Sequence, residues 1–315
     1  MAAVLVQQPG DIQLDLREVK LEVDSPSPNT DSGVLLDSGG SSPEDHPAIM
    51  TTEDVGQSDQ PAVLPTSTTQ TIDYQDGPDR VIPADSLFTT HRDEPVRLRT
   101  EGNGPLGTTP ISVISLFHRT LKSFPKHTAL AHKRDGQWKK WTYEQYYSEV
   151  TQTAKAFIKL GLEPYHGVGI IGFNSPEWFI SDVAAIFAGG FAVGIYTTNS
   201  AEACQYVANN ADCNIIVVEN DAQLQKVLKV RAQLPQLRAI IQYSGKPKEQ
   251  YPDVYSWDEM LAVGKEGSDD QLQQRIRMQA PNKCCTLIYT SGTTGNPKGV
   301  MLSHDNIVWT ADVAG

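Results

Sequence analysis

The chain has 315 residues, a formal net charge of −12 at pH 7 and four cysteines. Residues 1–80 contain 15 acidic and three basic residues, so the whole net charge lies in this segment and residues 81–315 sum to zero. This acidic balance disfavours nucleic acid as a partner. Four cysteines without metal-ligand or disulfide spacing exclude a zinc module and a disulfide-stabilised small domain, and they predict buried free thiols in a reducing cytosol.

Residues 1–80 have the composition of a disordered tail. They contain one aromatic residue, Tyr74, together with eight prolines and 15 serines and threonines. Such a segment cannot bury enough apolar surface to offset the entropy lost on ordering it. The sequence therefore predicts a disordered acidic tail over residues 1–80 and one ordered region over residues 81–315.

No targeting or transmembrane segment is predicted. Residues 1–10 lack the basic and long apolar parts of a secretory signal. The longest uncharged run of the ordered region, Val183–Ala201, contains three glycines and a Thr-Thr-Asn-Ser stretch, which make it too polar to span a bilayer. We therefore expect a cytoplasmic protein.

The first part of the ordered region predicts two helices and a hairpin. In chain order these are a helix capped by Thr109 with Pro110 at its first position and running to Phe124, a hairpin of Thr128–Lys133 and Trp138–Thr142 that turns at Asp135-Gly136, and a helix from the Thr142 cap to Leu160. Gly161 then ends this second helix.

Short apolar strands then alternate with amphipathic helices. The predicted strands are Val168–Phe173, Phe191–Tyr196, Asn214–Glu219, Leu237–Tyr243 and Cys284–Tyr289, and helices start at caps Ser175, Ser200 and Asp221. Nearly continuous apolar strands with helices between them predict an α/β fold, in which a mainly parallel sheet is covered by helices on both faces. The adjacent Cys284 and Cys285 should point to opposite faces of their strand.

The loop after the strand Cys284–Tyr289 has a composition suited to phosphate. Its residues are Thr290, Ser291, Gly292, Thr293, Thr294, Gly295, Asn296, Pro297 and Lys298, followed by Gly299 and a return strand Gly299–Ser303. Hydroxyls can donate hydrogen bonds to phosphate oxygens, lysine supplies a compact positive charge, and glycines allow positive φ and close backbone approach. Ligands of open α/β sheets collect beyond the carboxyl ends of strands, where this loop begins.

The loop has three alternative interpretations. A plain surface hairpin explains the glycines, but it gives no reason for four hydroxyl side chains and a lysine after a buried strand. A Walker loop needs Lys followed by Ser or Thr and then a helix, whereas Gly299 and a strand follow Lys298. A dinucleotide-binding fingerprint also needs a helix after its glycines.

The run Tyr289–Gly299, continued by Val300–His304, resembles the phosphate-loop signature of adenylate-forming (AMP-binding) enzymes. Further stretches resemble the bubblegum-type long-chain fatty acyl-CoA synthetases, namely Asn174–Trp178, Ala188–Gly190, Gly194–Thr198 and Glu202–Tyr206. The resemblance covers roughly residues 85–315. It implies that the ordered region is the N-terminal part of the large adenylate-forming domain.

The resemblance also implies the chemistry. Such enzymes join a fatty acid to ATP, release pyrophosphate, and pass the acyl group from the adenylate to CoA. Thr290 through Lys298 would hold the ATP phosphates, Lys298 would stabilise the leaving pyrophosphate, and Thr290 would also contact Mg²⁺. The implied partners are therefore fatty acid, ATP, Mg²⁺ and CoA, and peripheral attachment to the endoplasmic reticulum or another membrane stays open because long-chain acyl substrates partition into bilayers.

Compared with a complete enzyme of this family, residues 81–315 match an incomplete domain without the C-terminal lid domain. We therefore expect a fragment that is inactive by itself. The alternatives are a non-catalytic short product that acts as a binding or interaction protein, and an adenylate-forming enzyme that acts on a different carboxylate.

Other residues carry a structural and a functional interpretation side by side. His304 is either a catalytic base or, as we favour, a packing residue at a helix start. Asn174–Glu177 is either a ligand loop or, as we favour, a helix cap. Trp178 and Phe179 are expected to pack in the core rather than line an acyl site, and Lys139-Lys140 to form a solvated hairpin edge rather than a nucleic-acid face.

Overall fold

The computed structural model describes residues 4–6, 77–100, 108–134, 136–290 and 296–314. The strands are β1 (Val4–Val6), β2 (Thr128–Arg134), β3 (Gln137–Thr142), β4 (Gly167–Ile171), β5 (Phe191–Ile195), β6 (Ile215–Val218), β7 (Ala239–Gln242), β8 (Val254–Ser256), β9 (Cys284–Thr290) and β10 (Lys298–Ser303). The helices are α1 (Val113–Ser123), α2 (Tyr143–Lys159), α3 (Pro176–Phe187), α4 (Ala201–Asn210), α5 (Asp221–Val230), α6 (Trp257–Lys265), α7 (Asp269–Arg277) and α8 (His304–Ala314), with a short 3₁₀ helix at Arg231–Gln233.

A seven-stranded sheet forms the centre of the fold, with the strand order β10-β9-β5-β4-β6-β7-β8. All neighbouring strands are parallel except β9 and β10, which form an antiparallel ribbon at one edge. A second, three-stranded sheet contains β1 parallel to β2, and β2 antiparallel to β3. The α/β fold with a mainly parallel sheet that the sequence predicts is confirmed.

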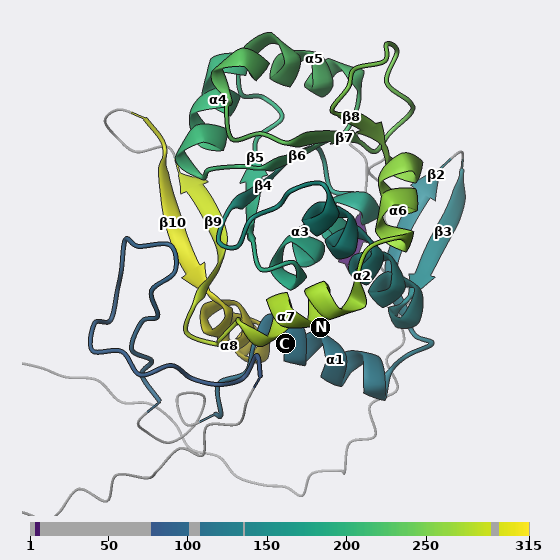
Figure 1. The fold of residues 1–315 in the computed structure, drawn as a ribbon. Coiled ribbons are helices and arrows are strands. Elements are labelled where there is room, and N and C mark those ends of the chain that lie inside the picture. The colour runs from purple at the N-terminus through teal and green to yellow at the C-terminus, as the bar shows by residue number, and fades with distance from the viewer. Residues whose placement is uncertain (1–3, 7–76, 101–107, 135, 291–295, 315) are drawn as a thin grey trace, which may run out of the picture. The chain divides into compact units, whose positions relative to one another are not determined.

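Helices cover both faces of the large sheet (Figure 1). The first hydrophobic core lies between one face and α1, α2, α3, α6, α7 and α8, and it contains Val168, Ile170 and Ile215. The second core lies between the other face and α4 and α5, and it contains Ile171 and Ile216. Every residue of β4, β6 and β7 is buried, which explains why these strands read as continuous apolar runs.

Most predicted helix starts are confirmed, because serine and threonine caps satisfy backbone N–H groups that have no partner within the helix. The side chains of Thr142, Ser175 and Ser200 accept hydrogen bonds from the third residue beyond each cap. Thr142 also forms a reciprocal capping box with Gln145. Gly161 follows α2 with φ of 102°, a conformation that glycine adopts without strain.

Two predicted caps are wrong by one to three residues. Helix α1 begins after Ser112 rather than at Thr109-Pro110, because the Ser112 hydroxyl accepts from Ser115 N while its own N–H and hydroxyl donate to Asp79. Helix α5 is capped by Asn220 rather than Asp221, whose carboxylate instead pairs with Lys248. In both cases a contact with a residue remote in the sequence helps to decide which side chain caps the helix.

The sequence did not predict β8, α6 or α7. A capping box of Ser256 and Glu259 starts α6, and this Ser-x-x-Glu spacing is visible in the sequence. Ser268 caps α7. Strand β8 is only three residues long and pairs with β7 alone, so its sequence pattern is too short to recognise.

The predicted tail, residues 1–80, lies mostly outside the described residues. Within it, the structure places β1 beside β2, and Asp79 against the start of α1. Residues 82 and 96 are held by one buried side chain, Asn282, which accepts from Ile82 N at 3.1 Å and donates to Ile82 O at 2.7 Å and Val96 O at 2.8 Å. Asn282 therefore ties the segment before α1 to the chain just before β9.

We predict that Asn282→Ala lowers the free energy of unfolding by roughly 3 kcal/mol, because it leaves the N–H of Ile82 and the carbonyls of Ile82 and Val96, all partly buried, without their partner. Urea unfolding followed by circular dichroism measures this loss. Asn209→Ala serves as a control, because Asn209 makes a hydrogen bond to Gln233 O from an exposed position and should cost less than about 0.5 kcal/mol. If both variants lost the same small amount of stability, the proposed role of the Asn282 side chain in holding residues 82 and 96 would be wrong.

Candidate functional site

The strands on either side of the predicted phosphate loop, β9 and β10, form an antiparallel ribbon (Figure 1). Thr290 is the last residue of β9 and Lys298 the first of β10, and the two are directly opposite in register. The Cβ atoms of directly opposed residues in an antiparallel pair of strands lie about 5 Å apart. The ladder therefore brings the first and last predicted phosphate ligands together.

The ribbon has one buried and one exposed face near its tip. Tyr289 and Met301 pack into the second hydrophobic core. On the other face Ile288 is 46% exposed and Val300 44% exposed. Cys285 lies in the first core and Cys284 in the second, as alternation along a strand requires.

Thr290 and Lys298 are both exposed. Within the described part of the chain, neither side chain makes a hydrogen bond or an ion pair, so a hydroxyl and a cation stand free beside each other. Asn296 is exposed as well, and Pro297 is half-buried. Ser291, Gly292, Thr293, Thr294 and Gly295 lie outside the described residues.

Gly299 has a different role from the one predicted. It does not adopt a positive φ; it is an extended residue of β10 opposite Tyr289. A Cβ atom at Gly299 would lie 2.9 Å from Cζ of Tyr289. Glycine is therefore needed because the tyrosine ring crosses over it.

A second place where ligands could collect lies at the carboxyl ends of the central strands. The chain passes from β4 to β5 on one side and later to β6 on the other, which makes the carboxyl ends of β4 and β6 a topological switch point. There Glu219 accepts a hydrogen bond from Phe173 N at 3.1 Å, and Tyr243 donates one to Phe173 O at 3.2 Å. Both polar groups of the Phe173 backbone are thus satisfied within the chain, whereas Thr290 and Lys298 are exposed, so the loop after β9 is the better candidate.

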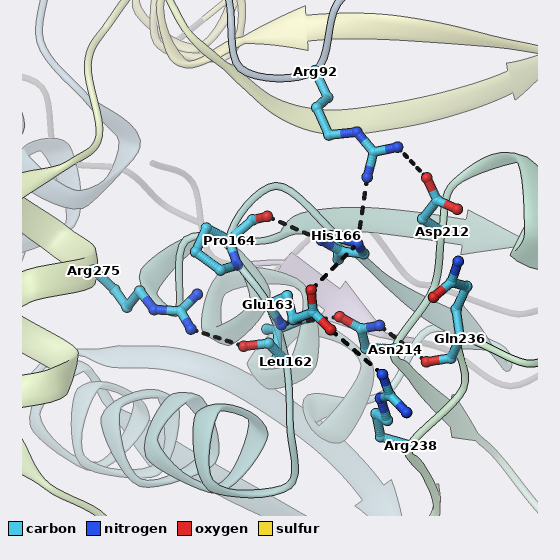
Figure 2. Close-up of polar contacts among 10 residues, drawn as sticks. All are labelled: Arg92, Leu162, Glu163, Pro164, His166, Asp212, Asn214, Gln236, Arg238 and Arg275. Atoms are coloured by element: carbon cyan, nitrogen blue, oxygen red, sulfur yellow. Dashed lines mark hydrogen bonds and ion pairs between the residues drawn. The ribbon is translucent and has the colours of Figure 1, made fainter.

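A polar network lies at the opposite, amino ends of the central strands (Figure 2). Asn214 accepts from Glu163 N at 2.9 Å and donates to Gln236 O at 3.0 Å. The His166 ring lies within hydrogen-bond distance of Pro164 O and of the Arg92 guanidinium, and it also lies near the Glu163 carboxylate. Arg92 forms an ion pair with Asp212, and Arg238 forms one with Glu163. Arg275 donates a hydrogen bond to Leu162 O. These contacts join the turns that precede β4, β6 and β7, which is a structural role.

His304 is a packing residue, as favoured from the sequence. Its side chain is fully buried, and burial lowers its pKa to about 4. Nδ1 accepts from Val113 N at 3.3 Å, so Nε2 carries the proton and donates to Gln279 Oε1 at 3.1 Å. The ring thus joins α8 to α1 and has no free nitrogen to act as a base.

The helix-cap interpretation of Asn174–Glu177 is confirmed as well. Ser175 caps α3, Pro176 is its first residue, and Glu177 forms a two-oxygen ion pair with Arg134 at 2.7 and 2.9 Å. Trp178 and Phe179 are half-buried against the first core, and the exposed Lys139 lies over the ring of Trp141 on the hairpin. All four cysteines are free and buried.

The family of this chain follows from its similarity to known proteins. Residues 117–314 match the family described as AMP-binding enzyme. The chain belongs to this family.

Relatives within the AMP-binding family share a common description. The long-chain-fatty-acid–CoA ligase ACSBG2 of Xenopus laevis is 60% identical over 229 residues, and that of Gallus gallus is 53% identical over 234 residues. These matches cover 73% and 74% of this chain but 31% of each relative, so the chain spans about a third of their length. A solved structure of the anthranilate CoA ligase AuaEII in complex with anthranoyl-AMP is 25% identical, with a TM-score of 0.55 over 64% of this chain and 36% of that one.

Two further findings concern membranes and metals. Among the helices that the structure describes, none is long and apolar enough to cross a membrane. The described residues also contain no group of three or more His, Cys, Asp and Glu side chains placed to hold a metal ion.

We predict that His304 makes stability depend on pH. An unfolded histidine titrates near its ordinary value of 6.5, whereas His304 in the fold titrates near 4. Between these values the unfolded state binds more protons, so this contribution to stability is present above pH 6.5 and is lost as the pH falls to 4. At about 1.4 kcal/mol per pKa unit, the loss is on the order of 3 kcal/mol.

The measurement compares the wild type with His304→Asn by urea unfolding at several pH values from 7 to 4.5. The variant should be less stable at pH 7, and the difference should shrink as the pH falls. Burial raises the pKa of Asp182 to about 7, which gives a slope of opposite sign, but this contribution is common to both proteins and cancels. A difference independent of pH would contradict the prediction.

Proposed function

We propose that this chain supplies the phosphate-binding part of a long-chain fatty acid–CoA ligase that works through an acyl-adenylate. In this proposal residues 81–315 are the N-terminal portion of an AMP-binding domain. The single observation that carries the site is the exposed Thr290 hydroxyl opposite the exposed Lys298 ammonium at the end of β9, where neither side chain has a partner among the residues that the structure describes. The similarity to ACSBG2 ligases supports the reaction and the substrate class.

The first step needs a stabilised leaving group. A carboxylate oxygen of the fatty acid bonds to the α-phosphorus of ATP while the bond to the bridging oxygen breaks, and pyrophosphate leaves with the electron pair. Fixed positive charge and hydrogen-bond donors lower the cost of that developing charge. Lys298 is proposed as the cation, and the hydroxyls and backbone N–H groups of Thr290–Pro297 as the donors.

The second step transfers the acyl group to CoA. The thiol gives up its proton, its sulfur bonds to the acyl carbon, and AMP leaves. Mg²⁺ commonly binds through substrate phosphates and few protein oxygens, and the Thr290 hydroxyl is the proposed protein contact. Its free position suits that role, and the ion would offset charge on the phosphates.

We also propose a cytoplasmic location, with peripheral contact to the endoplasmic reticulum or another membrane as the source of the fatty acid. Four buried free thiols suit a reducing compartment. The chain lacks a basic surplus, so attraction to anionic lipid is not the expected mode of contact.

We predict that Lys298→Ala weakens binding of magnesium pyrophosphate to this chain by about 10- to 100-fold, the loss expected for a hydrogen bond to a charged group. Titration calorimetry measures the affinity. Lys140→Ala is the matched control, because Lys140 is also an exposed lysine on an edge strand, and it should bind as the wild type does. Wild-type affinity in Lys298→Ala would remove Lys298 from the site.

We predict fatty acid-dependent chemistry in a polypeptide that continues this chain to the length of its relatives. With ATP, Mg²⁺ and palmitate it should release AMP and, with CoA added, accumulate palmitoyl-CoA. Lys298→Ala should slow pyrophosphate exchange by about 100-fold, as removal of one transition-state contact does elsewhere. Turnover of amino or aryl acids without any turnover of fatty acids would overturn the substrate assignment and leave the family assignment in place.

A further inference from the structure

Tyr289 connects the base of the phosphate loop to a distant helix. It is the residue before Thr290, its side chain is 5% exposed, and its hydroxyl donates a hydrogen bond of 2.7 Å to Oδ1 of Asn210. Asn210 is the last residue of α4 and lies 79 positions earlier in the chain. The hydrogen bond therefore joins the ribbon to a helix that is remote from it in the sequence.

The ribbon needs such a connection because its attachment to the sheet ends early. Strand β9 pairs with β5 at only two positions, Ala192 with Thr286 and Val193 with Leu287. Tyr289 and Thr290 lie beyond the last of these pairs and are held by β10, which has no other strand neighbour in the sheet. Beyond these pairs, the ribbon is held to the core by the packing of Tyr289 and Met301 and by the hydrogen bond from Tyr289 to Asn210.

Asn210 is a firm anchor because the turn around it is bonded to the core. Ala211 N donates to Val207 O at 3.0 Å and Cys213 N to Ala208 O at 2.8 Å, which close the end of α4. Ala211 O in turn accepts from Gly167 N, at the start of the central strand β4. The backbone next to Asn210 is thus hydrogen-bonded to the central strand of the sheet.

The geometry points to a positioning role for the pair, and we infer that Tyr289 and Asn210 hold the tip of the β9–β10 ribbon in the orientation that presents Thr290 and Lys298 to phosphate. The inference rests on the proposed function of the loop. Gly299 contributes to the same contact, because the absence of a side chain at this position lets the Tyr289 ring lie across β10 and reach α4.

Tyr289→Phe isolates the hydrogen bond, because phenylalanine keeps the ring over Gly299 and loses only the hydroxyl. Asn210→Ala removes the acceptor from the other side, whereas Asn210→Asp keeps an oxygen that accepts from tyrosine. Tyr146→Phe is the matched control: Tyr146 is similarly buried, and its hydroxyl donates to Phe179 O at 3.1 Å, between α2 and α3.

The first measurement is amide hydrogen exchange of the ribbon in the chain without ligand. Tyr289→Phe and Asn210→Ala should speed exchange in β10 by about 5-fold, the effect of one hydrogen bond lost from a local opening. Tyr146→Phe and Asn210→Asp should leave ribbon exchange unchanged. Unchanged exchange in Tyr289→Phe would overturn the anchoring role whatever the loop binds.

The second measurement is titration with magnesium pyrophosphate. Tyr289→Phe and Asn210→Ala should each weaken binding by about 5- to 10-fold, and the double variant should bind no more weakly than either one, because the two side chains form one interaction. Asn210→Asp should restore affinity close to that of the wild type. Tyr146→Phe should bind normally even if it melts at a lower temperature.

The outcomes separate this inference from the proposed function. If Lys298→Ala loses affinity while Tyr289→Phe does not, the loop binds phosphate and the positioning role is wrong. If the wild type does not bind pyrophosphate, the proposed function fails and the positioning role fails with it. Additive losses in the double variant would also overturn the inference, because they would show that the two residues act separately.

Discussion

Burial of the central strands on both faces is the constraint on which the rest of the structure depends. Strands β4, β6 and β7 expose no residue, so each needs helices above and below, and the parallel arrangement with crossover helices follows. A sheet enclosed in this way can meet a ligand only at the ends of its strands. The amino ends are joined by the polar network in Figure 2, which leaves the carboxyl ends for function.

The carboxyl ends are not equivalent, and the difference selects the site. At the switch point between β4 and β6, where open α/β sheets often bind ligands, Glu219 and Tyr243 already satisfy both backbone groups of Phe173. The end of β9 departs from the sheet with β10 as a two-stranded ribbon. One face of this ribbon is anchored in the core, and the other carries Thr290 and Lys298. This division lets one short element be held firmly and still expose its polar groups.

Sequence patterns predicted the elements that are locally determined. The strands before and after α3 and α4, the caps Thr142, Ser175 and Ser200, and the opposed cysteines Cys284 and Cys285 depend on neighbours within a few residues. The start of α1 was misplaced because Asp79, 33 positions earlier, engages Ser112. Strand β8 has three residues and gains its regularity from pairing with β7, so its own residues carried too little pattern.

The sequence by itself determined the fold class, the composition of the loop and the elimination of Walker and dinucleotide sites, because these depend on residue types and spacing along the chain. Only the tertiary structure decided that His304 is a neutral packing residue, that Gly299 is small to admit the Tyr289 ring, and that Asn210 meets Tyr289. Each of these depends on which distant residues the sheet and its helices bring within a few ångströms, and a one-dimensional pattern does not contain that proximity.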